Sequence, residues 1–176
     1  MIYQSIYSSP LGPILLSAND SALFELCLPS ELNKRSMIER TQLINNYHDH
    51  PIIKLIVQRL DDYFAFKRVT FNDLPLQPAG TSFQQQVWHQ LNQIPYGKIS
   101  SYGEIAQAIN NPKAVRAVGS AVGANPIAIL LPCHRVLGKD RSLTGFSGGL
   151  EIKKALLAIE NILYKEQQQQ QEFIFE

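Results

Sequence analysis

The 176-residue chain lacks long apolar runs, a set of cysteines and a strong net charge. No stretch approaches the roughly 18 apolar residues of a membrane span, and no basic, signal-like segment follows Met1. Two cysteines are too few for a disulfide framework. With 45% hydrophobic and 18% charged residues, the composition is that of a globular protein of one or two domains. We therefore expect a cytoplasmic protein with no membrane partner. We also expect it to act as a monomer.

Charge is distributed unevenly along the chain. Residues 1–80 carry seven Lys/Arg against eight Asp/Glu, residues 81–165 carry nine against four, and residues 166–176 carry none against three. A basic segment between acidic flanks indicates a polyanion-binding face confined to one part of the chain. Nucleic acid is the first candidate partner.

Residues 1–76 have the pattern of a small α/β domain. Apolar and polar residues alternate from Ile2 to Tyr7, and Pro10–Gly12 supplies turn residues, which together predict a β-hairpin. A third strand is expected over residues 22–28. We expect the three strands to form one small antiparallel sheet.

Two helices and a linker are expected next. A helix with a loose apolar pattern follows Ser30, and a firmer one begins at Pro51, because proline is favoured at a first helical position. Two prolines and a glycine then interrupt all periodicity over residues 74–80. We place the end of the linker, and with it the domain boundary, at residues 77–80.

Residues 81–165 have the pattern of a second, mainly helical domain. Ser82 with Gln85, and Ser101 with Glu104, have the spacing of capping boxes, so each pair predicts a helix start. The short helices and the tight turn between them are typical of a helix-turn-helix.

A third helix is expected to start at Asn111–Pro112 and to run to about Gly123. Its apolar side is formed by valines and its other side by one arginine, one lysine and small residues. The expected inward residues are Val115, Val118 and Val122, and the expected outward, DNA-contacting residues are Lys113, Arg116, Ala117 and Ser120.

The last part of the domain combines turns with one helix. Gly138–Arg141 is expected to be a hairpin tip, and Gly145–Gly149 a glycine-rich loop. Apolar spacing then predicts a final helix from Ile152 to Leu163. Residues 166–176 contain a glutamine run and are expected to be a flexible tail.

Cys133 is the candidate nucleophile. It follows the apolar run 127–131 and is adjacent to His134, and a thiol needs a base because little of it is ionised at neutral pH. Glu160 has the chemistry to orient that imidazole, and Asn125 lies in an Asn-Pro turn upstream. A buried structural cysteine and a solvated glutamate are the alternatives that these residues alone leave open.

In this context the chain resembles the methylated-DNA–protein-cysteine methyltransferase family of DNA repair proteins. The resemblance extends to about Tyr164, and its Pro-Cys-His-Arg-Val motif is highly specific. The matching segments are Ser8–Gly12, Thr81–Gln84, Ile94–Gly97, Gly123–Ile127, Pro132–Val136, Thr144–Gly149 and Leu156–Glu160. It implies a ribonuclease H-like α/β domain followed by a winged helix-turn-helix domain.

The resemblance also implies a reaction, the transfer of an alkyl group from O6 of guanine, or less readily O4 of thymine, to the protein. Cys133 is the implied acceptor, His134 the base acting through a water, and Glu160 the end of the relay. Asn125 is expected to brace the turn. Two further roles are implied: Tyr102 contacts a flanking phosphate and helps to protonate the leaving guanine, and Arg116 fills the space of the extruded nucleotide.

The base pocket is expected to be lined by Val136, Phe146 and the backbone N–H of Ser147. Phe146 departs from the tyrosine that many family members carry. Because the product is a thioether that nothing in the chain can cleave, we expect one turnover per molecule and no cofactor.

Three rival functions remain at this point. They are a module that binds alkylated bases without transfer, a helix-turn-helix transcriptional regulator, and a cysteine hydrolase. The presence of Cys133 favours transfer over the first, and Ala117 and Ser120 are too short for the second. Cys27 is expected to be a structural thiol, and His48 with His50 to bind no metal.

Overall fold

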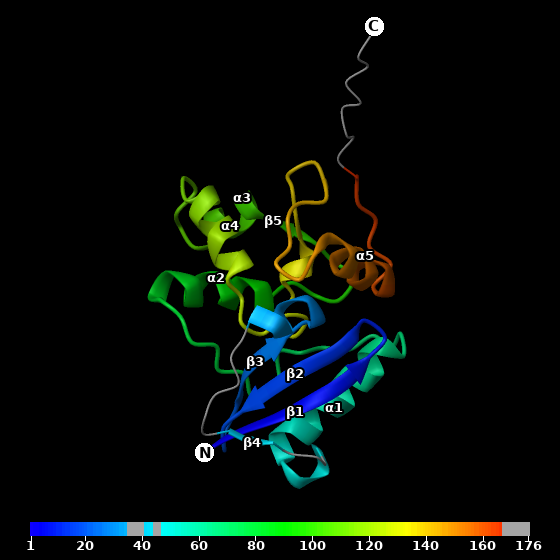
Figure 1. Cartoon of the computed structure of the whole chain (residues 1–176). Helices are drawn as coiled ribbons and strands as arrows, with labels where there is room; N and C mark the ends of the chain where they lie inside the picture. The colour runs from blue at the N-terminus through cyan, green and yellow to red at the C-terminus, as the bar shows by residue number, and fades with distance from the viewer. Residues whose placement is uncertain (35–40, 44–46, 167–176) are drawn as a thin grey trace, which may run out of the picture.

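The computed structural model describes residues 1–34, 41–43 and 47–166 (Figure 1). Its N-terminal half is a four-stranded sheet of order β3-β2-β1-β4. The strands are β1 (Ile2–Ser9), β2 (Gly12–Ala18), β3 (Leu23–Cys27) and β4 (Thr41–Leu43). The antiparallel pairing of the first three strands is confirmed, whereas β4, which is parallel to β1, was not predicted.

Helix α1 (Pro51–Phe64) packs against this sheet and begins at the predicted proline. His50 caps it, because its Nδ1 accepts a hydrogen bond from the amide of Ile53 at 3.3 Å. The segment after Ser30 is a 3₁₀ helix over Pro29–Lys34, shorter and tighter than the helix expected there.

The C-terminal half is helical and lies above the sheet in Figure 1. Its elements are α2 (Ser82–Asn92), β5 (Ser100–Ser101), α3 (Tyr102–Ala108), α4 (Val115–Gly123), a 3₁₀ turn (Cys133–Arg135), β6 (Val136–Leu137) and α5 (Leu150–Ile159). Strands β5 and β6 pair in parallel.

The expected helix starts are correct for α3 and wrong for α2. Ser101 and Glu104 form a capping box as predicted. At α2 the box consists of Thr81 and Gln84 instead, because Thr81 has the extended backbone of a cap while Ser82 already lies within the helix. The two neighbouring positions offer the same spacing, so the pattern alone does not distinguish them.

The start of α4 also differs from the prediction. The amide of Asn111 donates to Ala106 O at 2.9 Å, and the amide of Ala114 donates to Asn111 O at 3.0 Å, so this segment closes α3 with a turn. Helix α4 therefore begins only at Val115, without a side-chain cap. Val115 is not an inward residue: it is 42% exposed, at the rim of a groove that Tyr102 also lines.

Two further expectations are corrected. Gly138–Arg141 is a turn, but no hairpin flanks it, because β6 pairs with β5 while Ser142 forms a bridge with Lys165. Helix α5 ends at Ile159, and Leu163 beyond it is 80% exposed.

The two halves share one core and are joined by backbone hydrogen bonds. The amide of Leu26 in β3 donates to Pro126 O at 2.9 Å, and Leu26 pairs with Ile127 as in a parallel sheet. The apolar segment 127–131 is buried at this junction. The chain that leads to Cys133 is thus anchored on the N-terminal sheet.

Candidate active site

Cys133 begins the 3₁₀ turn at the end of the buried segment 127–131. It is only 3% exposed, and its amide donates to Leu131 O at 2.7 Å. Burial raises the pKa of its thiol to about 11, although a hydrogen bond with Asn125 and the positive charge of Lys153 act in the opposite direction. The thiol is therefore protonated at neutral pH and needs a base to become a nucleophile.

His134 is fully buried, and its two ring nitrogens have different surroundings. Nε2 is hydrogen-bonded to Oε2 of Glu160, whereas Nδ1 has no hydrogen-bond partner within the part of the chain that the structure describes. Burial lowers the pKa of His134, and the ion-pair partner Glu160 only partly offsets this. A neutral ring that donates from Nε2 leaves Nδ1 as a free proton acceptor.

Glu160 caps the C-terminus of α5 and is not the solvated charge that its spacing also permitted. Its Oε2 accepts from Tyr63 OH at 2.8 Å in addition to His134, and its Oε1 accepts from Arg135 Nε at 2.7 Å and from the amide of Gly97 at 3.0 Å. Burial alone would raise its pKa, but His134 and Arg135 outweigh burial and hold the pKa at about 2. Glu160 is therefore an ionised acceptor at neutral pH.

Asn125 lies just after α4 and bridges two backbone segments. Its Nδ2 donates to Leu131 O at 2.7 Å, and its Oδ1 accepts from the amide of Ile127 at 3.0 Å. The side chain therefore spans the buried segment immediately before Cys133.

Sequence reasoning missed Lys153, Tyr63, Arg135 and Gly97. Lys153 is 1% exposed and donates from Nζ to Val136 O at 2.9 Å. Burial lowers its pKa to about 8. The available signal was its position, three residues before the core residue Leu156 on the apolar side of α5, where a lysine is out of place.

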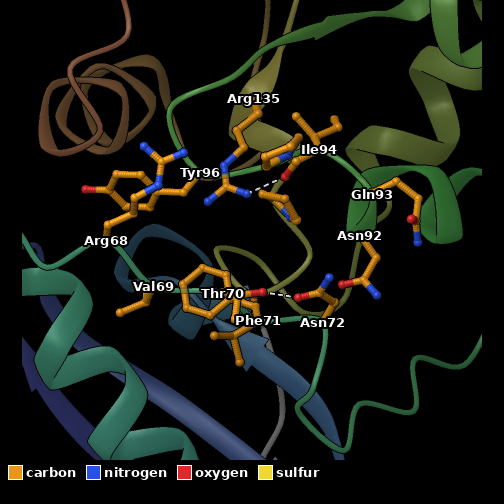
Figure 2. Close-up of a pocket in the computed structure, with 13 residues that line it drawn as sticks. Arg68, Val69, Thr70, Phe71, Asn72, Asn92, Gln93, Ile94, Tyr96 and Arg135 are labelled. Atoms are coloured by element: carbon orange, nitrogen blue, oxygen red, sulfur yellow. Dashed lines mark hydrogen bonds between the residues drawn. The ribbon is translucent and has the colours of Figure 1, made fainter.

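Arg135 bonds to Glu160 and also lines a cavity of about 380 Å³, shown in Figure 2. Its guanidinium carbon lies 6.0 Å from the ring centre of Phe71 and 5.9 Å from that of Tyr96, and its Nη1 donates to Ile94 O at 2.6 Å. The cavity is lined by Pro132 and Arg135 but not by Cys133.

Two of the residues expected around the base, Val136 and Phe146, contact Lys153. Val136 is fully buried, Phe146 is half-buried with its ring centre 5.9 Å from Lys153 Nζ, and Ser147 is exposed. Tyr102, half-buried at the start of α3, shares a 2.7 Å hydrogen bond with Oγ1 of Thr144.

The N-terminal half supports the glycine-rich loop that carries Phe146 and Ser147. Ser30 Oγ donates to Gly148 O at 2.9 Å. A side chain at Gly148 would bring its Cβ to 2.4 Å from Leu28 Cδ1, so the loop lies directly on the 3₁₀ helix and the residue before it.

Helix α4 presents the predicted outward residues to solvent. Lys113, just before the helix, and Arg116, Ala117 and Ser120 within it are all exposed. Its buried side is formed by Val118, Ala121 and Val122. Trp88 of α2 contacts this buried side and donates a hydrogen bond from Nε1 to Ala121 O at 2.8 Å.

Two family models match the chain almost from end to end. The 6-O-methylguanine DNA methyltransferase ribonuclease-like domain matches residues 2–78, and the DNA binding domain of the same family matches residues 82–162. The chain belongs to the 6-O-methylguanine DNA methyltransferase family. As a member, it is a DNA repair enzyme of the methylated-DNA–protein-cysteine methyltransferase class, with a ribonuclease-like domain followed by a helical DNA-binding domain.

Relatives and solved structures agree with this family. The methylated-DNA–protein-cysteine methyltransferase of Haemophilus influenzae is 44% identical over 168 residues, which are 93% of this chain and 88% of the relative. The constitutive enzyme of Bacillus subtilis is 42% identical over 169 residues, 94% of this chain and 99% of the relative. The crystal structure of Mycobacterium tuberculosis OGT in complex with DNA is similar with a TM-score of 0.79 and 40% identity, covering 90% and 92% of the two chains.

Cys27 and His50 of this methyltransferase lie outside the site described above. Cys27 is buried in β3. His50 is the cap of α1, and no group of three metal-ligating side chains is found among residues 1–34, 41–43 and 47–166. Within the same residues, no helix has the length and apolar character to cross a membrane.

Proposed function

We propose that the chain binds duplex DNA, turns an O6-alkylguanine out of the base stack and transfers the alkyl group to its own Cys133. The observation that carries this proposal is the buried sequence Cys133–His134, in which Nε2 of His134 is held by Glu160 while Nδ1 has no hydrogen-bond partner among the described residues. That is the arrangement of a nucleophile, a base and an orienting carboxylate.

In the proposed reaction, Nδ1 of His134 takes the proton of the Cys133 thiol through a water. The thiolate attacks the alkyl carbon, a C–S bond forms, and the bond from this carbon to O6 breaks. The electron pair passes to the guanine, which takes up a proton with the help of the Tyr102 hydroxyl. Asn125 holds the turn in which Cys133 lies, and Glu160 keeps the imidazole in the required tautomer.

The product is a thioether, and hydrolysis does not reverse it. The protein is therefore consumed after one transfer and requires no cofactor. We expect O4-alkylthymine to react less readily, in the same pocket formed by Val136, Phe146 and Ser147.

Helix α4 is the proposed DNA contact. A helix with long side chains is about 10 Å wide and does not fit a minor groove about 6 Å wide, so small residues such as Ala117 and Ser120 permit a close approach. Arg116 projects from this face and is proposed to occupy the space of the flipped nucleotide, while Lys113 and Tyr102 contact phosphates.

We further propose the domain organisation 1–76 for the ribonuclease-like domain, 77–80 for the end of the linker and 81–165 for the alkyltransferase domain. The Gln-rich tail at 166–176 lies outside the described residues except for Glu166, whose carboxylate is 3.1 Å from Lys154 Nζ. We also propose that the protein is a monomer and acts in the cytoplasm.

Intact-protein mass spectrometry after incubation with an O6-methylguanine duplex tests the function. We expect each chain to gain one methyl group, located on Cys133, and then to stop reacting. Cys133→Ala should bind the duplex without gaining mass, and Cys27→Ala, the matched control, should react like the wild type. Binding without transfer by the wild type would indicate a base-binding module instead, and transfer by Cys133→Ala would exclude Cys133 as acceptor.

A further inference from the structure

We propose that Tyr63, in the ribonuclease-like half of the chain, is a positioning residue for the His134–Glu160 pair. This inference rests on the transfer mechanism proposed above and adds to it a residue from outside the DNA-binding domain.

The geometry singles out the hydroxyl of Tyr63. Tyr63 lies on α1 and is completely buried, and its OH donates to Oε2 of Glu160 at 2.8 Å. The same oxygen is bound to Nε2 of His134. Tyr63 is therefore one bond away from the group that orients the base, although it lies 97 residues from Glu160 in the sequence.

The ring of Tyr63 is held in a single direction by other aromatic rings. Its centre lies 5.5 Å from that of Phe71 and 6.2 Å from that of Tyr96, and it meets Phe64 edge-on at 5.4 Å. Burial and the nearby Glu160 charge raise the pKa of Tyr63, so the hydroxyl stays protonated and remains a donor. Phenylalanine would fill the same space, so the hydroxyl adds the contact with Glu160 and little else.

This contact has two physical consequences. It restrains rotation of the carboxylate, so that Oε2 stays in line with His134 Nε2. It also shares the negative charge of Oε2, because a hydrogen bond from a neutral donor draws electron density from the acceptor. Without it, Oε2 would attract the imidazolium form of His134 more strongly, and His134 would take up a proton at higher pH.

The other charged or titratable groups around the pair act together with Tyr63. Arg135 and Lys153 both oppose protonation of His134, Cys133 is its neighbour in the turn, and Tyr96 approaches Glu160 from the loop after α2. None of these groups changes when the hydroxyl of Tyr63 is removed, so an altered pH profile is assigned to the lost contact.

The test compares Tyr63→Phe with Tyr7→Phe. Tyr7 is a matched control, because it lies in the same half and its OH donates to Asp61 Oδ1 at 2.8 Å, away from Glu160. Single-turnover methyl transfer from an O6-methylguanine duplex is measured across pH. We expect Tyr63→Phe to lower the pH-independent rate of transfer about tenfold, which is a small part of what a general base contributes. We also expect the acid limb of the pH–rate profile, where the rate falls as His134 is protonated, to move to higher pH. Tyr7→Phe should change neither.

A second variant separates the hydrogen bond from packing. 4-Aminophenylalanine at position 63 keeps a donor on the same ring, and we expect it to restore the acid limb of the wild type. The proposal is overturned if the acid limb of Tyr63→Phe does not move, if the amino variant shifts as far as Tyr63→Phe, or if Tyr63→Phe fails to fold while Tyr7→Phe folds. Absence of transfer by the wild type would instead refute the proposed function.

Discussion

Asn125 spans the segment before the reactive turn: it donates from Nδ2 to the carbonyl oxygen of Leu131 and accepts at Oδ1 from the amide of Ile127. The side-chain amide supplies a donor and an acceptor at once, whereas a carboxylate at neutral pH has no proton to donate. Asn125 thereby connects the C-terminal end of α4, the helix where DNA is proposed to bind, to the segment that leads to Cys133.

Replacing Asn125 by alanine leaves the amide of Ile127 without its acceptor and Leu131 O with only the Cys133 amide as donor. We expect Asn125→Ala to lower the free energy of unfolding by about 2 kcal/mol, since an unpaired buried polar group costs 1–3 kcal/mol, and to slow transfer at least tenfold. Urea unfolding and single-turnover transfer measure the two effects. Asn125→Asp retains the acceptor but loses the donor, so full activity in that variant would show that the Leu131 contact is dispensable.

Acid should destabilise the protein in two stages. Burial lowers the pKa of His134 below 6.5, so the unfolded chain binds more protons and stability falls as the pH drops below 6.5. Glu160 has a pKa of about 2 in the folded protein against 4.5 for a free glutamate, so its contribution is present above pH 4.5 and is lost towards pH 2. In this second stage the free energy of unfolding falls by about 3 kcal/mol.

Thermal unfolding of the wild type and of Glu160→Gln across acid pH measures this dependence. The glutamine variant cannot titrate at this position, so its stability should change less between pH 4.5 and pH 2. Identical acid profiles for the two proteins would mean that Glu160 is not the ionised acceptor described here.

Phe146→Tyr should have a small effect. Phe146 is half-buried, and its ring faces the Lys153 ammonium at 5.9 Å, so the aromatic surface is retained and only a hydroxyl is added. We expect the transfer rate to change less than tenfold, which is about 1.4 kcal/mol of barrier. A larger change in either direction would show that this ring does more than form a wall.

Arg116→Ala should slow transfer from an alkylated duplex far more than transfer from the free alkylated base. A side chain that fills the space of the flipped nucleotide matters only where a base must be unstacked, which costs a few kcal/mol. Lys113→Ala is the matched control on the same exposed face. It should weaken duplex binding and reduce by about one unit the slope of the logarithm of the binding constant against the logarithm of the salt concentration.

Rates at saturating protein decide the role of Arg116. Equal slowing with both substrates would place Arg116 in support of the pocket, and unchanged duplex transfer would make it an ordinary surface arginine.

Much of the fold was predictable because local patterns and tertiary structure agree. Alternation from Ile2 to Tyr7 and the proline at position 51 were sufficient for the hairpin and for α1. Strand β4 was not predictable, because three residues in parallel pairing across a long connection leave no periodic signal. Val115 has the spacing of an inward residue but is exposed in the first turn of α4.

The candidate site was predictable where its residues are adjacent in sequence, as Cys133 and His134 are. Glu160 was named as an orienting group, but its other partners Tyr63 and Gly97 come from distant segments and have no motif of their own. Lys153 was not singled out, although a cation among the apolar positions of α5 was a signal in itself. Long-range hydrogen bonds to a shared acceptor are a property of the folded chain and not of any window of sequence.

The four-way bonding of Glu160 also has a consequence for biosynthesis. Glu160 follows all four of its donors in the sequence, so they are translated before it; these donors are Tyr63, Gly97, His134 and Arg135. On the ribosome, Cys133 and His134 therefore precede the carboxylate that orients the base. The proposed relay is therefore complete only once α5 has docked, and a chain in which α5 is still unfolded would hold the thiol without an oriented base.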